Sequence, residues 1–136
     1  MKFHHVGIVV PKIQDSLGEI TKFLKFDTIS VPSFIGSQKV NVCFLKAGEA
    51  YLEFIEPAEE NSPVSNFVRS GGGIHHICFE VKDIHKEVRE IIDKGGRLIV
   101  SPVKGFEERL IAFVFLNMEN TKCNLIELVE EKVNNN

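Results

Sequence analysis

The sequence has few of the features that would place a chain in a membrane, in an oxidising compartment or on nucleic acid. Its apolar stretches are far shorter than the ~18 residues of a membrane span, and its N-terminus lacks a signal peptide's cleavage pattern. It has only three cysteines, without a Cys-x-x-Cys spacing, which favours reduced thiols in a cytoplasmic protein. Lysine and arginine number 16 against 19 acidic residues, so a basic surface for nucleic acid is not expected.

One eight-residue sequence motif occurs twice in the chain. FHHVGIVV begins at residue 3 and IHHICFEV at residue 74. Sliding the chain by 71 residues superposes both His-His pairs and carries Phe44 onto Phe115. Three extra residues in the following turn then place Glu53 on Glu127. Because this register runs through a strand, a helix and a later strand, it predicts two tandem copies, 1–57 and 73–131, joined by a linker at 58–72.

Each copy has the pattern strand, helix, strand, strand, strand. The helices are expected at 13–26 and 84–96, because apolar residues recur there at helical spacing. Asp83 is a plausible N-cap for the second helix, and Gly95-Gly96 supplies its stop. In the linker, Ser62-Pro63 looks like a helix start, and glycines 71–73 like a flexible joint. The sequence therefore predicts an α+β fold in which two βαβββ modules form a single domain, 1–136.

Strand parity gives the direction of the candidate functional side chains, because successive residues point to opposite faces. The apolar alternation puts four side chains off the face that packs on the helices: His5, Glu53, His76 and Glu127. If the two copies pair about a pseudo-twofold axis, the four converge. Two imidazoles and two carboxylates suit a borderline-to-hard divalent metal.

Each of these residues also has an ordinary structural interpretation. A lone histidine on a strand is more often packed or on the surface, and a lone glutamate is usually solvated. Their joint occurrence at equivalent repeat positions favours the metal site. We expect His4 and His75 to pack, His85 to lie on a helix surface, Cys78 to line the pocket at most, and the pairs Glu59-Glu60 and Glu130-Glu131 to be solvated.

At these residues the chain resembles the vicinal oxygen chelate superfamily, specifically its glyoxalase I and methylmalonyl-CoA epimerase branch. The resemblance rests on HHVGIVV, YLEFIEP, SPVSNF, GGGIHHICFEV and LIELVE. It implies one glyoxalase-like domain with a metal-binding cleft, and its four ligands fall on the residues that parity selects: His5, Glu53, His76 and Glu127. We expect one Ni²⁺, Co²⁺, Mn²⁺ or Zn²⁺ per chain, and a homodimer.

The chemistry of this branch is removal of a proton next to a metal-polarised carbonyl of a thiol-linked substrate. The first interpretation is a lyase of the glyoxalase I type, acting on a hemithioacetal, with Glu127 and Glu53 as bases. The alternative is methylmalonyl-CoA epimerase, acting on a thioester. Against the family's Glu-Gln/His-Gly-Val pattern, Ser37 stands where epimerases carry a second glutamate. Glu107 or Glu108, in KGFEER, are further candidate bases.

Three other functions are weaker hypotheses. An extradiol dioxygenase uses two histidines and one glutamate around Fe(II), and a fourth ligand at Glu53 would crowd its open positions. A metal-dependent thiol transferase acting on an antibiotic finds no specific support. A metal-free antibiotic-resistance module, which sequesters a small molecule, would have no reason to keep four ligands.

Overall fold

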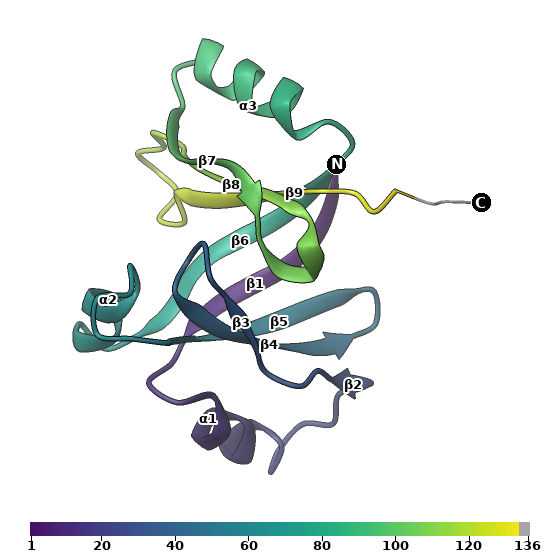
Figure 1. The fold of residues 1–136 in the computed structure, drawn as a ribbon, viewed down its shortest axis with the longest axis vertical. Coiled ribbons are helices and arrows are strands. Elements are labelled where there is room, and N and C mark those ends of the chain that lie inside the picture. Colours follow the sequence, from purple (N-terminus) through teal and green to yellow (C-terminus); the bar gives the residue numbers. More distant parts are fainter. Residues whose placement is uncertain (134–136) are drawn as a thin grey trace. The chain divides into compact units, whose positions relative to one another are not determined.

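The computed structural model describes residues 1–133 and divides into two compact units. One unit holds residues 5–75, and the other holds residues 1–4 together with the chain from residue 76 onward. The first part of the chain contains β1 (Lys2–Val9), α1 (Ile13–Ile20), β2 (Thr28–Ile29), β3 (Ser33–Ile35), β4 (Val40–Ala47), β5 (Ala50–Pro57) and α2 (Ser65–Arg69). The second contains β6 (Gly73–Val81), α3 (Ile84–Asp93), β7 (Arg97–Lys104), the 3-10 helix η1 (Phe106–Glu108), β8 (Leu110–Phe115) and β9 (Leu125–Glu130) (Figure 1).

The unit of residues 5–75 is a half-sheet with apolar residues on both faces. In it β1 pairs in parallel with β5, β5 is antiparallel to β4, and β4 is antiparallel to both β2 and β3. On one face, Ile13 of α1 packs against Val10, Cys43, Leu45 and Phe54. On the other, Val9, Val40, Val42 and Ile55 pack with Val64. His5, Gly7 and Val9 share this second face, as their parity predicts.

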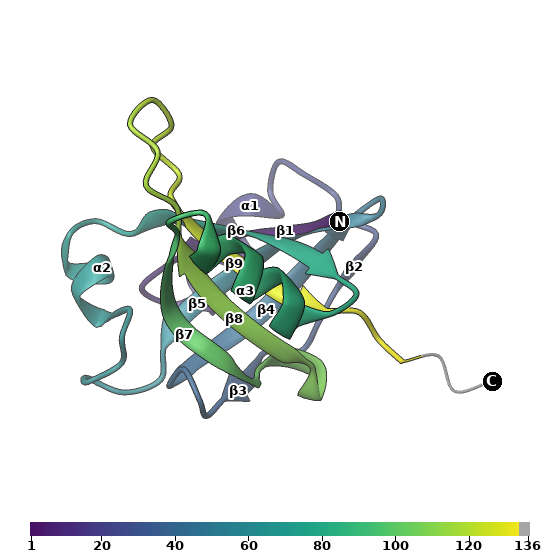
Figure 2. The same ribbon diagram turned by 90° about the horizontal axis from the view of Figure 1, so that it is seen from above.

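The second unit repeats this arrangement around α3. Strand β6 pairs in parallel with β9, β9 is antiparallel to β8, and β8 is antiparallel to β7. Ile84 and Val88 of α3 pack on Val81, Ala112, Val114, Ile126 and Leu128. Figure 2 shows the helix α3 in front of strands β8 and β9 of this unit. The α+β class is thus confirmed, with α1 packed on one face of the strands of its unit and α3 packed on one face of the strands of the other.

The first copy departs from the expected pattern in its third element. The strand that the pattern places directly after the first helix, in TISVPSF at 28–34, is divided into β2 and β3, with Pro32 in the segment between them. Proline has no backbone N–H to give to a strand ladder, which explains the break. Both short strands still pair with β4.

Two helix boundaries also differ from those predicted. Helix α1 ends at Ile20, where the Thr21 hydroxyl donates to the carbonyl of Leu17, and Leu24 is 55% exposed rather than packed. Such a hydroxyl competes with backbone hydrogen bonds. Helix α2 begins at Ser65 instead of next to Ser62, whose hydroxyl accepts from the Val64 N–H.

The second helix begins at Ile84 as predicted and ends at Asp93, three residues before the end of the predicted range and just before its glycine stop. The Asp83 carboxylate accepts a hydrogen bond from the Lys86 N–H at 3.1 Å. Gly95 has a φ of 99°, and its neighbour Gly96 donates to the carbonyl of Ile91. The glycine segment 71–73, which the sequence marks as a flexible connection, forms a turn in which Gly71, Gly72 and Gly73 all have positive φ. A Cβ on Gly72 would lie 2.7 Å from the carbonyl oxygen of Val9.

Strand register corrects the internal alignment of the repeat. Phe44 of β4 lies opposite Glu53 of β5, and Phe113 of β8 lies opposite Glu127 of β9. The structural equivalent of Phe44 is therefore Phe113, two positions before the Phe115 that the constant displacement selects. The longer β8–β9 connection absorbs the difference as a projecting loop (Figure 2), held at its base by Asn124, whose amide donates to carbonyls of Leu116 and Met118.

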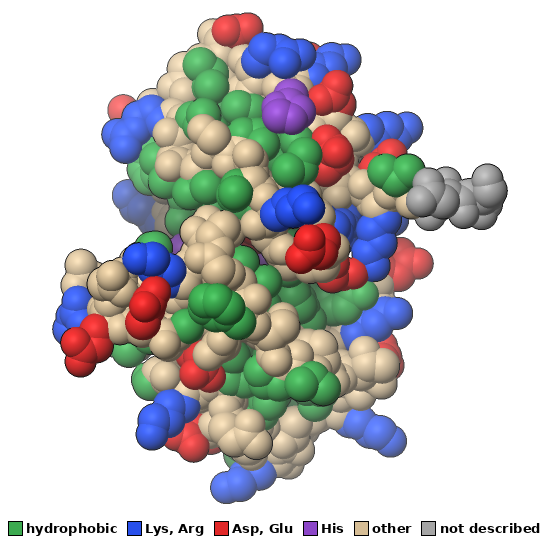
Figure 3. Space-filling model, viewed as in Figure 1, with side chains coloured by type: hydrophobic (Ala, Val, Ile, Leu, Met, Phe, Trp, Pro, Cys, Tyr) green, Lys and Arg blue, Asp and Glu red, His purple; other side chains and the backbone are tan. Residues whose placement is uncertain are grey.

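The surface carries charge of both signs. On the face drawn in Figure 3, acidic and basic side chains are interspersed rather than sorted by sign. Among residues 1–133, none of the helices is both long and apolar enough to cross a membrane.

Candidate metal centre

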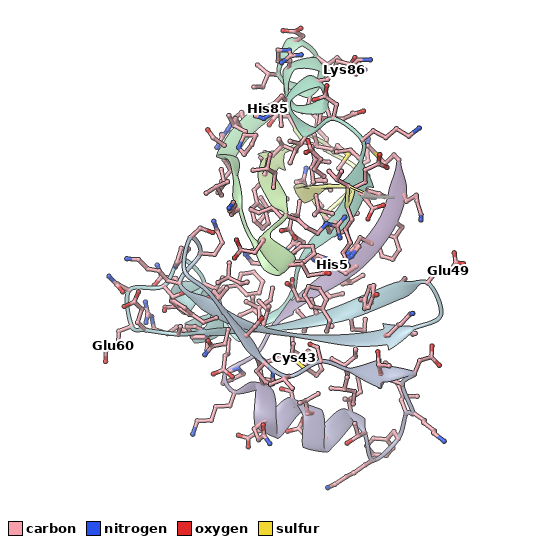
Figure 4. The ribbon with its side chains drawn as sticks, turned by 45° about the vertical axis from the view of Figure 1, so that its right-hand side comes forward. His5, Cys43, Glu49, Glu60, His85 and Lys86 are labelled. Carbon is pink, nitrogen blue, oxygen red and sulfur yellow. The ribbon has the colours of Figure 1, made fainter. Side chains whose placement is uncertain are left out.

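The first unit holds a buried histidine-glutamate pair. His5 comes from β1 and Glu53 from β5, and the parallel register aligns Glu53 with Gly7, two residues beyond His5. The His5 Nε2 atom lies 3.1 Å from Glu53 Oε1. His5 is 0% and Glu53 4% exposed, although parity had placed both on an open face. Figure 4 shows His5 on its strand, with Cys43 on the side of the half-sheet that faces α1.

The second unit holds the same pair in the same arrangement. His76 comes from β6 and Glu127 from β9, whose register aligns Glu127 with Cys78, again two residues beyond the histidine. His76 Nε2 lies 3.0 Å from Glu127 Oε1, and both residues are buried. The sequence prediction that each glutamate turns toward the histidine face of its own copy is thus confirmed in both units.

The donor atoms of each pair fit a divalent cation. Neutral imidazole nitrogen and carboxylate oxygen are common ligands of borderline and hard metals. Two donors at adjacent corners of an octahedron with bonds of about 2.1 Å are separated by about 3.0 Å. The separations within the two pairs, 3.1 and 3.0 Å, match that value. Each unit therefore brings two potential ligand atoms to the spacing that adjacent octahedral positions require.

The remaining histidines have the structural roles expected of them. His4 stacks on Phe106 with ring centroids 5.3 Å apart, and His75 meets Phe67 edge to face at 5.0 Å. His85 is exposed on α3 beside Lys86 (Figure 4). Cys43 and Cys78 are buried thiols that form no disulfide; burial raises the pKa of the Cys43 thiol, and its hydrogen bond to Ser30 opposes that rise in part.

A second glutamate in each copy has a structural role that the sequence argument missed. The Glu56 carboxylate accepts the Ile13 N–H at 3.0 Å, and the Glu130 carboxylate accepts the Ile84 N–H at 3.1 Å. Each therefore binds the first N–H of the helix in its own unit. The expectation that Glu130 is an ordinary solvated charge is wrong. The shared Glu-x-x-Glu spacing of YLEFIEP and LIELVEE was the available signal.

The two glutamates of the KGFEER loop are held by cations. Glu107 lies against Lys132 and 3.8 Å from Arg109, and Glu108 lies 3.5 Å from Lys104. Both residues have left-handed backbone, with φ of 56° and 59°. Each carboxylate is thus engaged by a cation, so a role as second catalytic base would require this ion pair to break.

The turn between β3 and β4 has a left-handed residue at the position where the family pattern has glycine. Ser37 is exposed in this turn, and Lys39 has a φ of 53°. Lys39 aligns with the glycine of the Glu-Gln/His-Gly-Val pattern, and a left-handed φ is the conformation that favours glycine. The turn geometry thus supports the alignment that puts serine at the position of the epimerase glutamate.

Comparison with known proteins supports this structural assignment. Residues 4–113 match the family described as the Glyoxalase/Bleomycin resistance protein/Dioxygenase superfamily. The chain is 31% identical over 132 residues to the mitochondrial methylmalonyl-CoA epimerase of Dictyostelium discoideum, covering 96% of this chain and 78% of that protein.

Two solved structures have the same fold over nearly the whole chain. A hypothetical protein of Bacillus halodurans C-125 superposes with a TM-score of 0.86 at 33% identity, covering 98% of this chain and 96% of its own. A variant of Streptomyces coelicolor methylmalonyl-CoA epimerase, in complex with 2-nitronate-propionyl-CoA, gives 0.85 at 26% identity, covering 98% and 99%. With a matched family, a matched fold and the paired half-sites in place, the chain belongs to the Glyoxalase/Bleomycin resistance protein/Dioxygenase superfamily.

Proposed function

We propose that this protein is a divalent-metal-dependent epimerase of an acyl-CoA thioester of the methylmalonyl-CoA type. The observation that carries the proposal is the pair of equivalent, buried His/Glu half-sites in a chain related along its length to methylmalonyl-CoA epimerases. The relatives give the glyoxalase I interpretation no specific support, so the alternative interpretation becomes the first. Enzymatic activity of the isomerase kind is common to both.

In this proposal His5 and Glu53 join His76 and Glu127 as the ligands of one cation. The cation, when bound, supplies electrophilic polarisation of a substrate carbonyl and so acidifies the neighbouring C–H. Burial of all four side chains keeps bulk water from the donor atoms and strengthens their electrostatic interactions. The imidazoles must be neutral to bind, because a protonated ring has no free lone pair.

The proton transfers fall to the two carboxylates. One of them, Glu127 in our assignment, accepts the proton from the carbon next to the thioester carbonyl, and the C–H electron pair is delocalised into that carbonyl. Return of a proton to the opposite face inverts the carbon and leaves no net change in composition. Glu53, which comes from the other unit, is the candidate for that second face.

A glyoxalase I type reaction on a hemithioacetal remains the second candidate, favoured by one observation. Serine at position 37 stands where the family pattern has the second base of an epimerase, which leaves only Glu53 for that role, whereas a proton moved between adjacent carbons needs only one base. The homodimer and the cytoplasmic location inferred from the sequence remain predictions, as do the domain limits and the four site residues.

Solvent exchange tests the proposal directly. Metal-loaded protein is incubated in D₂O with methylmalonyl-CoA, and deuterium at the carbon next to the carbonyl is followed together with inversion. We expect exchange and inversion that chelation abolishes. Absence of both, with turnover of the methylglyoxal–thiol hemithioacetal instead, would replace the epimerase proposal by the glyoxalase one.

A further inference from the structure

The two half-sites share a third member that neither repeat alignment nor ligand chemistry identifies. Phe44 lies opposite Glu53 in the antiparallel β4–β5 pair, and its ring meets His5 at a centroid distance of 5.4 Å and an interplanar angle of 74°. A row of phenylalanine, glutamate and histidine thus spans three neighbouring strands of this unit.

The other unit repeats the same row with different local sequence. Phe113 lies opposite Glu127 in the β8–β9 pair, and its ring meets His76 at 5.1 Å and 88°. The neighbouring residues differ, since Phe44 is followed by Leu45 and Phe113 by Val114. The same ring thus stands beside both histidines although the flanking residues differ.

We propose that Phe44 and Phe113 are positioning residues that orient the His5 and His76 imidazoles for metal binding; the inference rests on the proposed metal site. The second side-chain torsion of histidine is soft, so the direction of its Nε2 lone pair needs an external constraint. A nearly perpendicular aromatic contact is favourable at these distances and restricts rotation of the imidazole. Metal binding then requires less ordering of the ligand.

The two rings are themselves supported differently. Phe44 also meets Tyr51 edge to face at 5.7 Å, and Tyr51 lies beside His5 across the β1–β5 pair. Phe113 lies opposite Val100 of β7, at a point where the β7–β8 register shifts. The Phe44 ring is thus contacted by a second aromatic ring, and the Phe113 ring stands at an irregular stretch of its sheet.

The test is the affinity of metal-free protein for Co²⁺, measured by chelator competition and by the visible spectrum of the bound ion. Phe44→Leu and Phe113→Leu remove the ring and keep an apolar side chain. Phe115→Leu is the matched control: Phe115 lies on the same strand and face as Phe113, but it pairs with Leu125 and stacks with Arg97 instead of a ligand.

Each ring deletion is expected to weaken Co²⁺ binding about three- to tenfold, the range of one aromatic pair contact, and to change the visible bands of bound Co²⁺. The Phe115 control should change affinity less than about twofold. Phe113→Tyr retains a ring and should restore wild-type affinity and spectrum, which a purely structural role would not require. Should a leucine variant fail to fold, Phe113→Met and Phe44→Met take its place.

The outcomes separate this inference from the proposed function. Wild-type protein that binds Co²⁺, with ring variants no weaker than the Phe115 control, overturns the positioning role alone. Wild-type protein that binds no Co²⁺ overturns the metal site and, with it, the inference. Weakened binding confined to the ring deletions and rescued by tyrosine supports both.

Discussion

Glu127 is buried, lies 3.0 Å from His76 and is assigned two roles, ligand and base. Glu127→Gln keeps an oxygen that can bind metal and removes the negative charge that accepts a proton. We expect metal to be retained, more weakly, and turnover to fall by roughly 10²–10⁴, the range for one positioned acid-base group. Metal content and deuterium exchange are measured on the same preparation. Full exchange in the metal-loaded variant would leave Glu127 as a ligand only.

Glu53→Gln should reduce turnover less than Glu127→Gln does if Glu53 is mainly a ligand.

Ser37 departs from the Glu-Gln/His-Gly-Val pattern that the family resemblance implies. Lys39 has a left-handed φ where that pattern has glycine, so a glutamate introduced at position 37 tests the alignment. We expect weak epimerisation by the unmodified protein and an increase in Ser37→Glu, with Ser33→Glu on β3 as a control. Fast epimerisation without the change would show that another group supplies the second base.

At the scale of elements, the Glu56 carboxylate connects the end of β5 to the start of α1, and the Glu130 carboxylate connects the end of β9 to the start of α3. Because Asp83 already caps α3, while Lys12 gives α1 no side-chain cap in the described structure, α1 depends more on its carboxylate. Glu56→Ala and Glu130→Ala should each lower the free energy of unfolding by about 0.5–2 kcal/mol, Glu56→Ala by the larger amount. Urea unfolding measures this, with exposed Glu131→Ala expected within about 0.5 kcal/mol of wild type. Equal stability of all three variants would contradict the capping role.

An ion pair between Glu80 of β6 and Arg109, the residue before β8, has a defined pH response. Arg109 is buried, donates to the Glu80 carboxylate at 2.6 Å and donates to the carbonyl of Glu130. Burial alone would raise the pKa of Glu80, but the hydrogen bond and charge of Arg109, with smaller effects of Lys2 and His4, hold this pKa below its usual range.

A lowered folded-state pKa contributes stability that is present above the unfolded carboxyl pKa and is lost as pH falls through the lowered value. Glu80→Gln should therefore cost about 1–3 kcal/mol at neutral pH, the range for a hydrogen bond to a charged group. The difference from wild type should shrink in acid. Urea unfolding at pH 7 and in the acid range checks this, and a pH-independent difference would show that packing, not charge, is responsible.

At the scale of the whole molecule, period-two alternation predicted most of what defines the site. It assigned His5 and His76 to the face opposite the helices, and Glu53 and Glu127 to the same faces as their histidines, because a residue's face depends only on odd or even position. For the same reason, alternation cannot detect a shift of two residues. Phe113 and Phe115 have the same parity, and only cross-strand pairing identified Phe113 as the partner of Glu127.

Other differences arise from contacts that have no periodic signal. The hydroxyl of Thr21 ends α1 earlier than the spacing of Ile20 and Leu24 indicates, and Pro32 divides a predicted strand. Glu130 looked solvated because it stands beside another glutamate near the chain end, yet its partner is a backbone N–H 46 residues away. Long-range hydrogen bonds of this kind follow from the tertiary fold, not from local composition.

The central claim, that both half-sites bind one cation, is tested by the metal stoichiometry and affinity of wild type, His5→Ala and His76→Ala, with exposed His85→Ala as control. We predict one Co²⁺ per wild-type chain, binding that weakens as pH falls through the histidine range, and a loss of at least about a hundredfold in affinity in either ligand variant. The control should bind as wild type does. A His76→Ala protein that still binds one Co²⁺ per chain with unchanged affinity would contradict the account.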